Sequence, residues 1–400
     1  MSEEVVIVDA VRTPFGRYNG ILKSVRPDDL GAIVIKALLE RNPEIKPAEI
    51  EEVILGNANQ AGEDNRNVAR MSSLLAGLPV EVGGSTVNRL CGSGLDAVNY
   101  AARAILAGEG EVFIAGGTES MTRAPLVMAK PQIEYPRGNM ELYDTTIGWR
   151  FTNERLRANY GAESMPETAE NVAREYAITR EEQDRFALES QRRAREAIQK
   201  GYFKEEIASV TFKDRKGNEC LAERDEHPRP ETTLEKLTQL KPIFPNGTIT
   251  AGNSSGVNDG AAALLLMASK KADQLGLKPL GKYIVSASAG VHPSVMGIGP
   301  VDSTRKALKR AGLSVDDIDL IELNEAFAAQ SIACMKLLEL NPDKVNVNGG
   351  AIAFGHPLGA SGARILTTLL YEMKRRKVKY GLATMCIGVG QGISTIVENI

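Results

Sequence analysis

The feature that most constrains the fold of this chain is a regular alternation of short apolar runs with amphipathic stretches. Four apolar-rich runs have the length of buried strands, at residues 5–8, 53–55, 112–115 and 320–323. Three stretches carry apolar side chains at helical spacing, at residues 30–39, 95–105 and 301–311. Strands that alternate with helices predict an α/β protein with a largely parallel sheet.

The same order of elements occurs twice along the chain. Aligning residues 52–54 with 319–321 places Asn57 over Asn324, and each half continues with a glycine-rich turn, a helix and a strand that ends in glycines. From residue 121 to 248, proline-rich turns and a charged helix at 180–199 replace this pattern. The sequence therefore predicts two matched halves with one insertion. The predicted units are residues 1–120 with 249–273, the inserted residues 121–248, and residues 274–400.

Composition and charge narrow the classes of function. The 400 residues hold 48 Lys and Arg against 51 Asp and Glu, a net charge of −3, which does not favour a nucleic-acid partner. No apolar run approaches the roughly 20 residues that span a bilayer, and neither end resembles a secretory or peroxisomal signal. The four cysteines are scattered and lack CxxC spacing, so we expect no metal site, no disulfide scaffold and a reducing, cytoplasmic compartment.

The first motif that can carry chemistry is Val-Asn-Arg-Leu-Cys-Gly-Ser-Gly at residues 87–94. It lies between a predicted strand and a predicted helix, which places Cys91 at a helix N-terminus. The helix dipole favours an anion there, and a thiolate is the nucleophilic form of cysteine, so we expect a lowered pKa for Cys91. The alternative is that Cys91 is a small buried side chain at a strand–helix corner.

Two further motifs contain a histidine and a second cysteine. His356 lies between Gly355 and Pro357 in a glycine-rich stretch that precedes a predicted helix, so a rigid turn displays it and it can act as a general base. The alternative is a histidine that caps a loop by hydrogen bonds. Cys386 precedes a Gly-x-Gly-x-Gly run after the last predicted strand. That run is not a dinucleotide fingerprint, because no helix can follow so near the C-terminus.

Two polar segments complete the candidates. Asn324 follows a predicted strand, where its amide can orient a water or stabilise an oxyanion, although it can also be a plain helix N-cap. Residues 252–256 match Gly-x-Ser-x-Gly before an apolar run at 261–268 that we expect to be helical. That context makes a serine hydrolase an alternative function.

The blocks around Cys91, Asn324, His356 and Cys386, in this order, resemble those of the thiolase family of acyl-CoA acyltransferases. The likeness runs from residues 8–14 to residues 390–392. It implies the thiolase fold, with two duplicated βαβαβαββ halves in a layered α-β-α-β-α core and an inserted loop domain. It also implies an acetyl-CoA C-acyltransferase that acts on 3-oxoacyl-CoA or acetoacetyl-CoA, in condensation or in thiolytic cleavage.

The resemblance assigns a role to each block. Cys91 carries the acyl group as a thioester, His356 takes the thiol proton, and Cys386 exchanges the α-proton of acetyl-CoA. The N–H groups of Cys91 and Gly388 form one oxyanion hole, and His356 forms the other with a water held by Asn324. A covalent intermediate of this kind predicts ping-pong kinetics.

The resemblance also implies that coenzyme A and acetyl-CoA are substrates, that no cofactor is tightly bound, and that the protein is a homodimer or homotetramer of fatty acid metabolism. The residues that match coenzyme A contacts are Arg229 at the adenine, Phe244, Ala251 and Ser255 along the pantetheine, and Met165, Met296 and Phe327 at the acyl end. For the last three, ordinary core packing is the alternative.

The acyl substrate stays open at this point. Residues 164–172 lack the histidine that many biosynthetic acetoacetyl-CoA thiolases have there. Residues 58–70, 144–151 and 225–230 look closer to β-ketoadipyl-CoA thiolases, so a 3-oxoadipyl-CoA thiolase of aromatic degradation is an alternative. A condensing enzyme that uses acyl carrier protein typically lacks the second reactive cysteine. A non-catalytic lipid carrier is not expected to keep both cysteines and the histidine.

Overall fold

The computed structural model describes residues 3–214 and 216–400 and is built around one mixed sheet. In spatial order the main strands are β12 (Leu320–Leu323), β13 (Tyr380–Ile387), β14 (Gln391–Glu398), β11 (Gly281–Gly290), β1 (Val5–Arg12), β10 (Asn258–Ala268), β5 (Val112–Ser120), β3 (Glu52–Gly56) and β4 (Gly83–Val87), with β2 (Gly16–Arg17) beside β10. The predicted strands are all present. In addition, β5 continues through the glycines at 116 and 117, where it was expected to end.

The prediction of a largely parallel sheet is wrong. Between the described strands of the main sheet, parallel pairing is confined to β3 with β4 and β5, and to β12 with β13. The other neighbours in the main sheet are antiparallel. A short turn between β13 and β14 enforces an antiparallel pair, because parallel neighbours need a long crossover. The apolar run 261–268 belongs to β10 rather than to a helix, so this expectation is also wrong.

The two halves meet where β1 pairs with β11, over the short register Val5–Ile7. In each half, a strand that is directly followed by an asparagine pairs in parallel with its neighbour. β3 precedes Asn57 and pairs with β5, and β12 precedes Asn324 and pairs with β13. This correspondence confirms the duplication that the sequence predicts.

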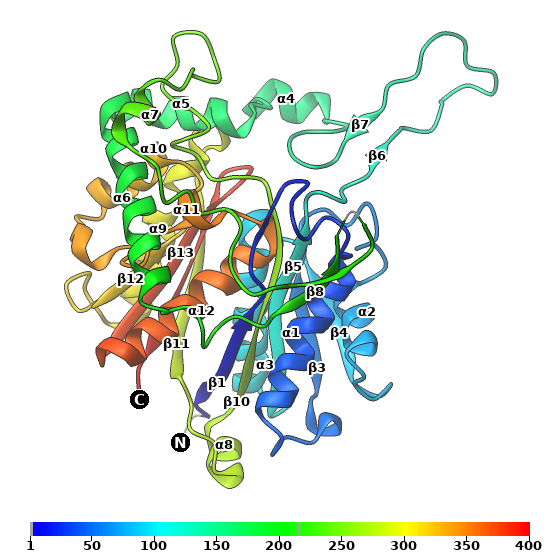
Figure 1. Ribbon diagram of the computed structural model, residues 1–400, viewed down its shortest axis with the longest axis vertical. Helices are drawn as coiled ribbons and strands as arrows, with labels where there is room; N and C mark the ends of the chain where they lie inside the picture. Colours follow the sequence, from blue (N-terminus) through cyan, green and yellow to red (C-terminus); the bar gives the residue numbers. More distant parts are fainter. Residues whose placement is uncertain (1–2, 215) are drawn as a thin grey trace.

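Helices cover both outer faces and fill the space between the halves. The helices are α1 (Pro27–Arg41), α2 (Val68–Leu75), α3 (Ser93–Ala107), α8 (Ser269–Leu275), α9 (Gly299–Ala311), α10 (Ala328–Leu337), α11 (Ala351–Phe354) and α12 (Leu358–Arg376). One apolar cluster joins α1 and α2 to the outer face of the N-terminal strands, and a second joins α9 and α10 to the C-terminal strands. A third joins α3 and α12 to strands of both halves (Figure 1). This arrangement confirms the predicted α-β-α-β-α layers.

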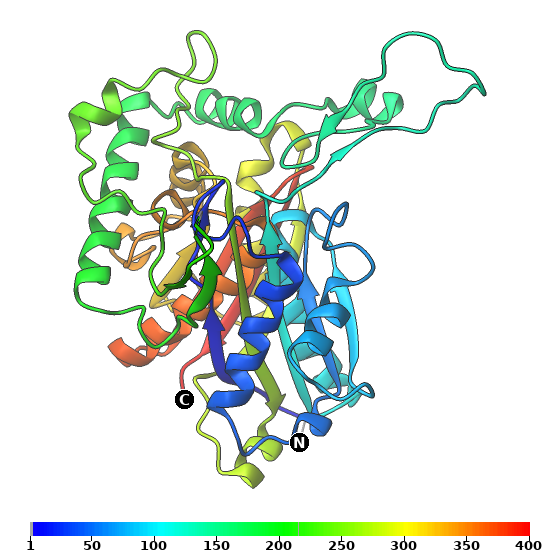
Figure 2. The same cartoon turned by 45° about the vertical axis from the view of Figure 1, so that its right-hand side comes forward.

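The segment from 121 to 248 has its own elements. They are β6 (Leu126–Val127), β7 (Tyr143–Asp144), α4 (Glu154–Tyr160), α5 (Met165–Glu175), α6 (Arg180–Gln199), β8 (Val210–Lys213), β9 (Glu219–Ala222) and α7 (Leu234–Thr238). The arm that carries β6 and β7 extends away from the body (Figure 2). The division into three units at these boundaries stays a prediction. Among the described residues, no helix is both long and apolar enough to cross a bilayer.

Candidate active site

Cys91 lies in a short 3-10 turn, Leu90–Gly92, between β4 and α3, as the sequence predicts. The backbone N–H groups of Gly388 and of Cys91 itself hydrogen-bond to the thiol and act to lower its pKa. Burial has the larger effect and raises the pKa to about 11. The expected lowering of the Cys91 pKa is therefore wrong, because desolvation disfavours the thiolate more than these donors stabilise it. A neutral thiol in this position needs a base to become a nucleophile.

His356 is positioned by its backbone and by the turn before α12. The backbone N–H of His356 donates to Asn258 Oδ1 at 3.0 Å. The preceding Gly355 has φ +96°, and a Cβ there would lie 2.2 Å from the Asn258 side chain. Because this φ and this close approach both require glycine, the Gly-His-Pro sequence holds the imidazole in one place.

The hydrogen bonds of the His356 ring fix its tautomer. Its Nδ1 lies 2.6 Å from the Ser361 Oγ, which donates its proton to the Pro357 carbonyl at 2.9 Å. The hydroxyl therefore accepts from Nδ1–H, which leaves a lone pair on Nε2. Nε2 is 3.5 Å from the Asn324 Nδ2. Burial lowers the His356 pKa to about 3, so the ring is neutral and can accept a proton at Nε2.

Cys386 is the penultimate residue of β13 and is buried. The expectation that it follows the last strand is wrong, because residues 388–390 form a turn into the further strand β14. Burial raises the pKa of the Cys386 thiol well above its ordinary value, and the neighbouring thiols of Cys91 and Cys334 raise it further. Cys386 is thus a neutral thiol at ordinary pH and can act as a proton donor.

Asn324 lies directly after β12 and is fully buried. It is not a helix cap, because Phe327 is the N-cap residue of α10. Its Oδ1 has no hydrogen-bond partner among the described residues. A buried carbonyl acceptor without a partner costs free energy unless a water or ligand donates to it, so the amide is suited to hold such a group.

The N-termini of α3 and α12 meet at this site. A Cβ on Gly94 of α3 would lie 2.5 Å from the Gly359 carbonyl oxygen of α12, so only glycine permits this approach. The buried Glu119 carboxylate accepts from the N–H groups of Ala58 at 2.9 Å and Gly359 at 2.8 Å and ties α12 to the loop after β3. Burial raises the Glu119 pKa to about 7. Two converging helix N-termini favour negative charge where Cys91 lies.

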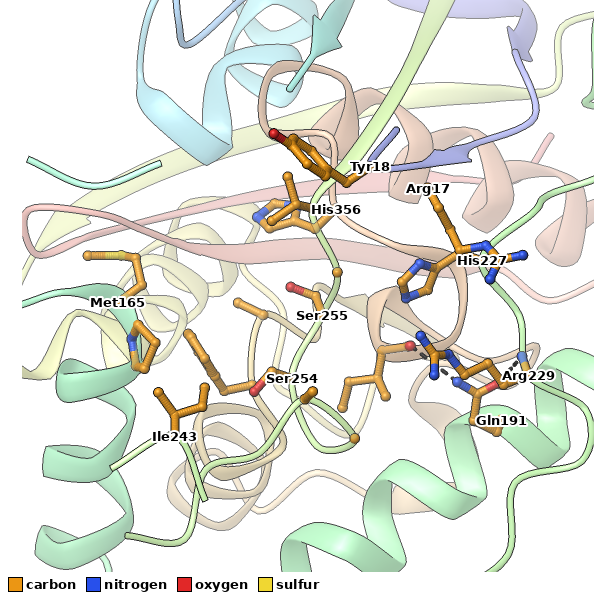
Figure 3. Close-up of a pocket in the computed structure, with 18 of the residues that line it drawn as sticks. Arg17, Tyr18, Met165, Gln191, His227, Arg229, Ile243, Ser254, Ser255 and His356 are labelled. Carbon is orange, nitrogen blue, oxygen red and sulfur yellow. Dashed lines mark hydrogen bonds between the residues drawn. The ribbon is translucent and has the colours of Figure 1, made fainter. Parts of the chain in front are cut away.

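A cavity of about 920 Å³ brings most of the predicted residues together, although Asn324 does not line it. Its lining includes the predicted Cys91, His356, Cys386, Met165, Arg229, Ala251, Ser255, Met296 and Phe327. Figure 3 shows Met165 and Arg229 toward opposite ends of the cavity, with His356 and Ser255 between them. Phe244, although described, does not line it, and the neighbouring Ile243 does. Gly388 lines an adjoining cavity that also contains Cys91.

The Gly-x-Ser-x-Gly stretch has a different role from the one a serine hydrolase needs. Ser254 donates its hydroxyl proton to the Thr250 carbonyl at 2.8 Å, and the Ser255 N–H donates to the Ala326 carbonyl at 2.9 Å. Across residues 252–268 the segment leads into strand β10, without the helix of a nucleophile elbow. The serine hydrolase alternative is therefore wrong.

Several site residues were not predicted. Ser361 lies within the His356 motif, five residues further along, where its hydroxyl reaches back to the ring. Asn258 and Glu119 had no comparable signal, because each acts on segments far away in the sequence. Arg17, Tyr18 and His227 also line the cavity. Of these three residues, His227 is the one that lies close in the sequence to a predicted coenzyme A contact, Arg229.

Two family models cover almost the whole chain. The model of the thiolase N-terminal domain matches residues 5–270, and that of the C-terminal domain matches residues 277–399. The chain belongs to the thiolase family. This thiolase is therefore an acyl-CoA acyltransferase, which confirms the fold, the enzyme class and the acyl-transfer function that the motifs predict.

Named relatives and solved structures agree with this assignment. A β-ketoadipyl-CoA thiolase of Acinetobacter baylyi is 57% identical over 397 residues, which cover 98% of this chain and 99% of the relative. A 3-oxoadipyl-CoA/3-oxo-5,6-dehydrosuberyl-CoA thiolase of Escherichia coli is 57% identical over 400 residues, covering 99% and 100%. The crystal structure of the Bacillus anthracis acetyl-CoA acetyltransferase superposes with a TM-score of 0.94 at 42% identity and covers 100% of this chain and 99% of that one.

Proposed function

We propose that this thiolase acts on 3-oxoadipyl-CoA, a 3-oxoacyl-CoA whose chain ends in a carboxylate. The observation that carries the acyl-transfer chemistry is the meeting of Cys91, His356 and Cys386 at one cavity. The choice of substrate rests on the 57% identity to relatives named for β-ketoadipyl-CoA and 3-oxoadipyl-CoA. These names favour a dicarboxylic acyl chain over the fatty acid metabolism expected from the family alone.

In the cleavage direction, Cys91 Sγ attacks the C3 carbonyl of the substrate while its proton moves to His356 Nε2. The bond between C2 and C3 then breaks, the acetyl-CoA enolate takes a proton from Cys386, and a succinyl thioester stays on Cys91. The His356 imidazolium returns its proton to the Cys386 thiolate. The thiol of a second coenzyme A then gives its proton to the neutral His356 and attacks the thioester; the departing Cys91 thiolate takes that proton back, and succinyl-CoA is released. Condensation is the reverse sequence. The neutral thiols and neutral imidazole of the site support this assignment of proton donors and acceptor.

Each oxyanion that develops in the reaction needs preorganised donors. We assign the first to the N–H groups of Cys91 and Gly388, which already hydrogen-bond to the Cys91 sulfur. We assign the second to His356, together with a water held by Asn324. The unpartnered Oδ1 of Asn324 supports a water there.

The long cavity supports a coenzyme A path from Arg229 past Ala251 and Ser255 toward Cys91. Arg17 and Lys236 line the same cavity and add positive charge for the phosphates of coenzyme A. Met165, Met296 and Phe327 then lie at the acyl end. Phe244 is the least supported of the proposed contacts, since Ile243 takes its place in the lining.

The remaining features of the proposal concern the whole molecule. We propose three units with boundaries at residues 120/121, 248/249 and 273/274, assembled as a homodimer or homotetramer in the cytoplasm, with coenzyme A as a substrate and no tightly bound cofactor. The four free cysteines support a reducing compartment, because thiol chemistry at Cys91 and Cys386 requires reduced sulfur.

A panel of substrates tests the proposal. We expect kcat/KM for thiolysis to be highest for 3-oxoadipyl-CoA when it is compared with acetoacetyl-CoA and 3-oxohexanoyl-CoA. The last substrate has the same number of acyl carbons and lacks the terminal carboxylate. A higher kcat/KM for either of the neutral substrates would refute 3-oxoadipyl-CoA as the preferred substrate while leaving the thiolase chemistry in place.

A further inference from the structure

A second cavity, of about 200 Å³, adjoins the first at the reactive thiol. Both are lined by Cys91, Met121 and Met165. The proposed coenzyme A contacts Arg229, Ala251 and Ser255 belong to the large cavity, and none of these described residues lines the small one. An acyl group held on Cys91 can therefore extend into the small cavity while coenzyme A occupies the large one.

The walls of the small cavity combine apolar side chains with one cation. Leu90, Ile147, Trp149, Met165 and Val389 supply the apolar surface. Thr145 also lines it, but its hydroxyl donates to the Pro125 carbonyl at 2.7 Å and accepts from Asn59. Among the described residues of the lining, Arg150 is the sole permanent cation.

The Arg150 guanidinium is available to a ligand. Its one hydrogen bond within the described chain is a long one, 3.4 Å from Nη2 to the Asn59 carbonyl oxygen. No described carboxylate forms an ion pair with it. The side chain is half-buried, so its charge is partly removed from water without an anion to compensate it. An anionic ligand group in the cavity would supply that partner.

One carboxylate, that of Glu119, also lines this cavity, and both of its oxygens already accept hydrogen bonds from the protein. Both oxygens of Glu119 accept N–H donors, from Ala58 and Gly359 at Oε2 and from Asn59 at Oε1. Burial raises its pKa to about 7, which reduces its negative charge at neutral pH. Glu119 therefore offers little competition for Arg150.

We infer that Arg150 binds the terminal carboxylate of the acyl chain and so selects dicarboxylic 3-oxoacyl-CoA substrates. This inference rests on the proposed function, because the succinyl group left on Cys91 by 3-oxoadipyl-CoA carries that carboxylate. A guanidinium binds a carboxylate through two parallel hydrogen bonds. A neutral acyl chain of equal length leaves the half-buried charge unpaired, so the same residue that favours a carboxylate disfavours an alkyl end.

The test compares Arg150→Gln with Arg157→Gln, a matched loss of charge at an exposed arginine of α4. For Arg150→Gln we expect kcat/KM on 3-oxoadipyl-CoA to fall about 10- to 100-fold, the range of a lost charge-assisted hydrogen-bonded pair. We expect kcat/KM on 3-oxohexanoyl-CoA to change less than about threefold. Arg150→Lys keeps the charge without the bidentate geometry, so it should recover part of the loss. Arg157→Gln should resemble the wild type on both substrates.

Acylation of Cys91 provides an independent readout. Succinyl-CoA or butyryl-CoA is mixed with the enzyme; Cys91 Sγ forms the new thioester, and the leaving coenzyme A thiolate takes the Cys91 proton through His356. Arg150→Gln should slow succinylation and spare butyrylation, as measured by intact mass. Equal losses with both acyl groups, or no loss with either, would overturn the role of Arg150. If the wild type itself fails to turn over 3-oxoadipyl-CoA, the proposed substrate is wrong and the inference falls with it.

Discussion

The hydrogen bond between His356 and Ser361 gives the sharpest test of how the catalytic base is prepared. Ser361→Ala removes the hydroxyl that lies 2.6 Å from His356 Nδ1 in a fully buried environment. An unsatisfied buried donor costs about 1–3 kcal/mol. The ring can avoid that cost by moving its proton to Nε2, where it can no longer accept the Cys91 proton. A barrier higher by about 1–3 kcal/mol slows acylation of Cys91 by about 5- to 150-fold.

The assay is the first-turnover release of coenzyme A from acetyl-CoA, which reports acylation alone. Thr367→Val is the matched control, because Thr367 lies on the same helix and donates to the carbonyl four residues earlier at 2.9 Å, as Ser361 does. It touches no catalytic group, so we expect a nearly normal acylation rate. A Ser361→Ala enzyme that acylates as fast as the wild type would refute the proposed fixing of the tautomer.

Three further predictions follow from the same geometry. The Cys386→Ser enzyme should still acylate Cys91, as measured by intact mass, but should catalyse condensation about 100-fold or more slowly, as measured by turnover. Equal losses in both steps would contradict the role of Cys386. Because burial raises the Cys91 pKa to about 11, alkylation by iodoacetamide near pH 7 should slow in His356→Ala, and an unchanged rate would contradict the need for a base. Burial lowers the folded-state pKa of His356 to about 3, so the unfolded chain binds more protons between that pH and its ordinary pKa. The contribution of His356 to the free energy of unfolding should therefore fall as pH drops from about 6.5 toward 3, and wild type and His356→Asn should lose stability differently in urea titrations over this range.

Local patterns predicted the elements whose signal is contained in a short window. Helix α6 and strand β12 have the predicted bounds, because capping residues, charge pairs and apolar runs decide them locally. The charges of helix α6 pair at i,i+4 spacing, as Glu181–Arg185 and Glu189–Arg193 show. The duplication was visible for the same reason, since the strand that precedes Asn57 and the strand that precedes Asn324 share a local pattern.

Features set by distant segments could not be predicted in this way. The run 261–268 is apolar throughout, so its periodicity does not distinguish a helix from a strand, and pairing with β1 and β5 on its two sides decides it. The helix N-terminus at Cys91 suggested a low pKa, but the burial that raises the pKa comes from packing of the whole site. Asn258, which holds the His356 backbone, lies 98 residues away in the sequence.

The central claim is that Cys91 carries the acyl group while Cys386 does not. Incubation with succinyl-CoA, which acylates the enzyme without cleavage of a carbon–carbon bond, followed by acid quench and peptide mass spectrometry, tests it directly. The account predicts one succinyl adduct, located on Cys91, retained in Cys386→Ser and absent in Cys91→Ser. An adduct on Cys386, or an adduct that persists in Cys91→Ser, would contradict it.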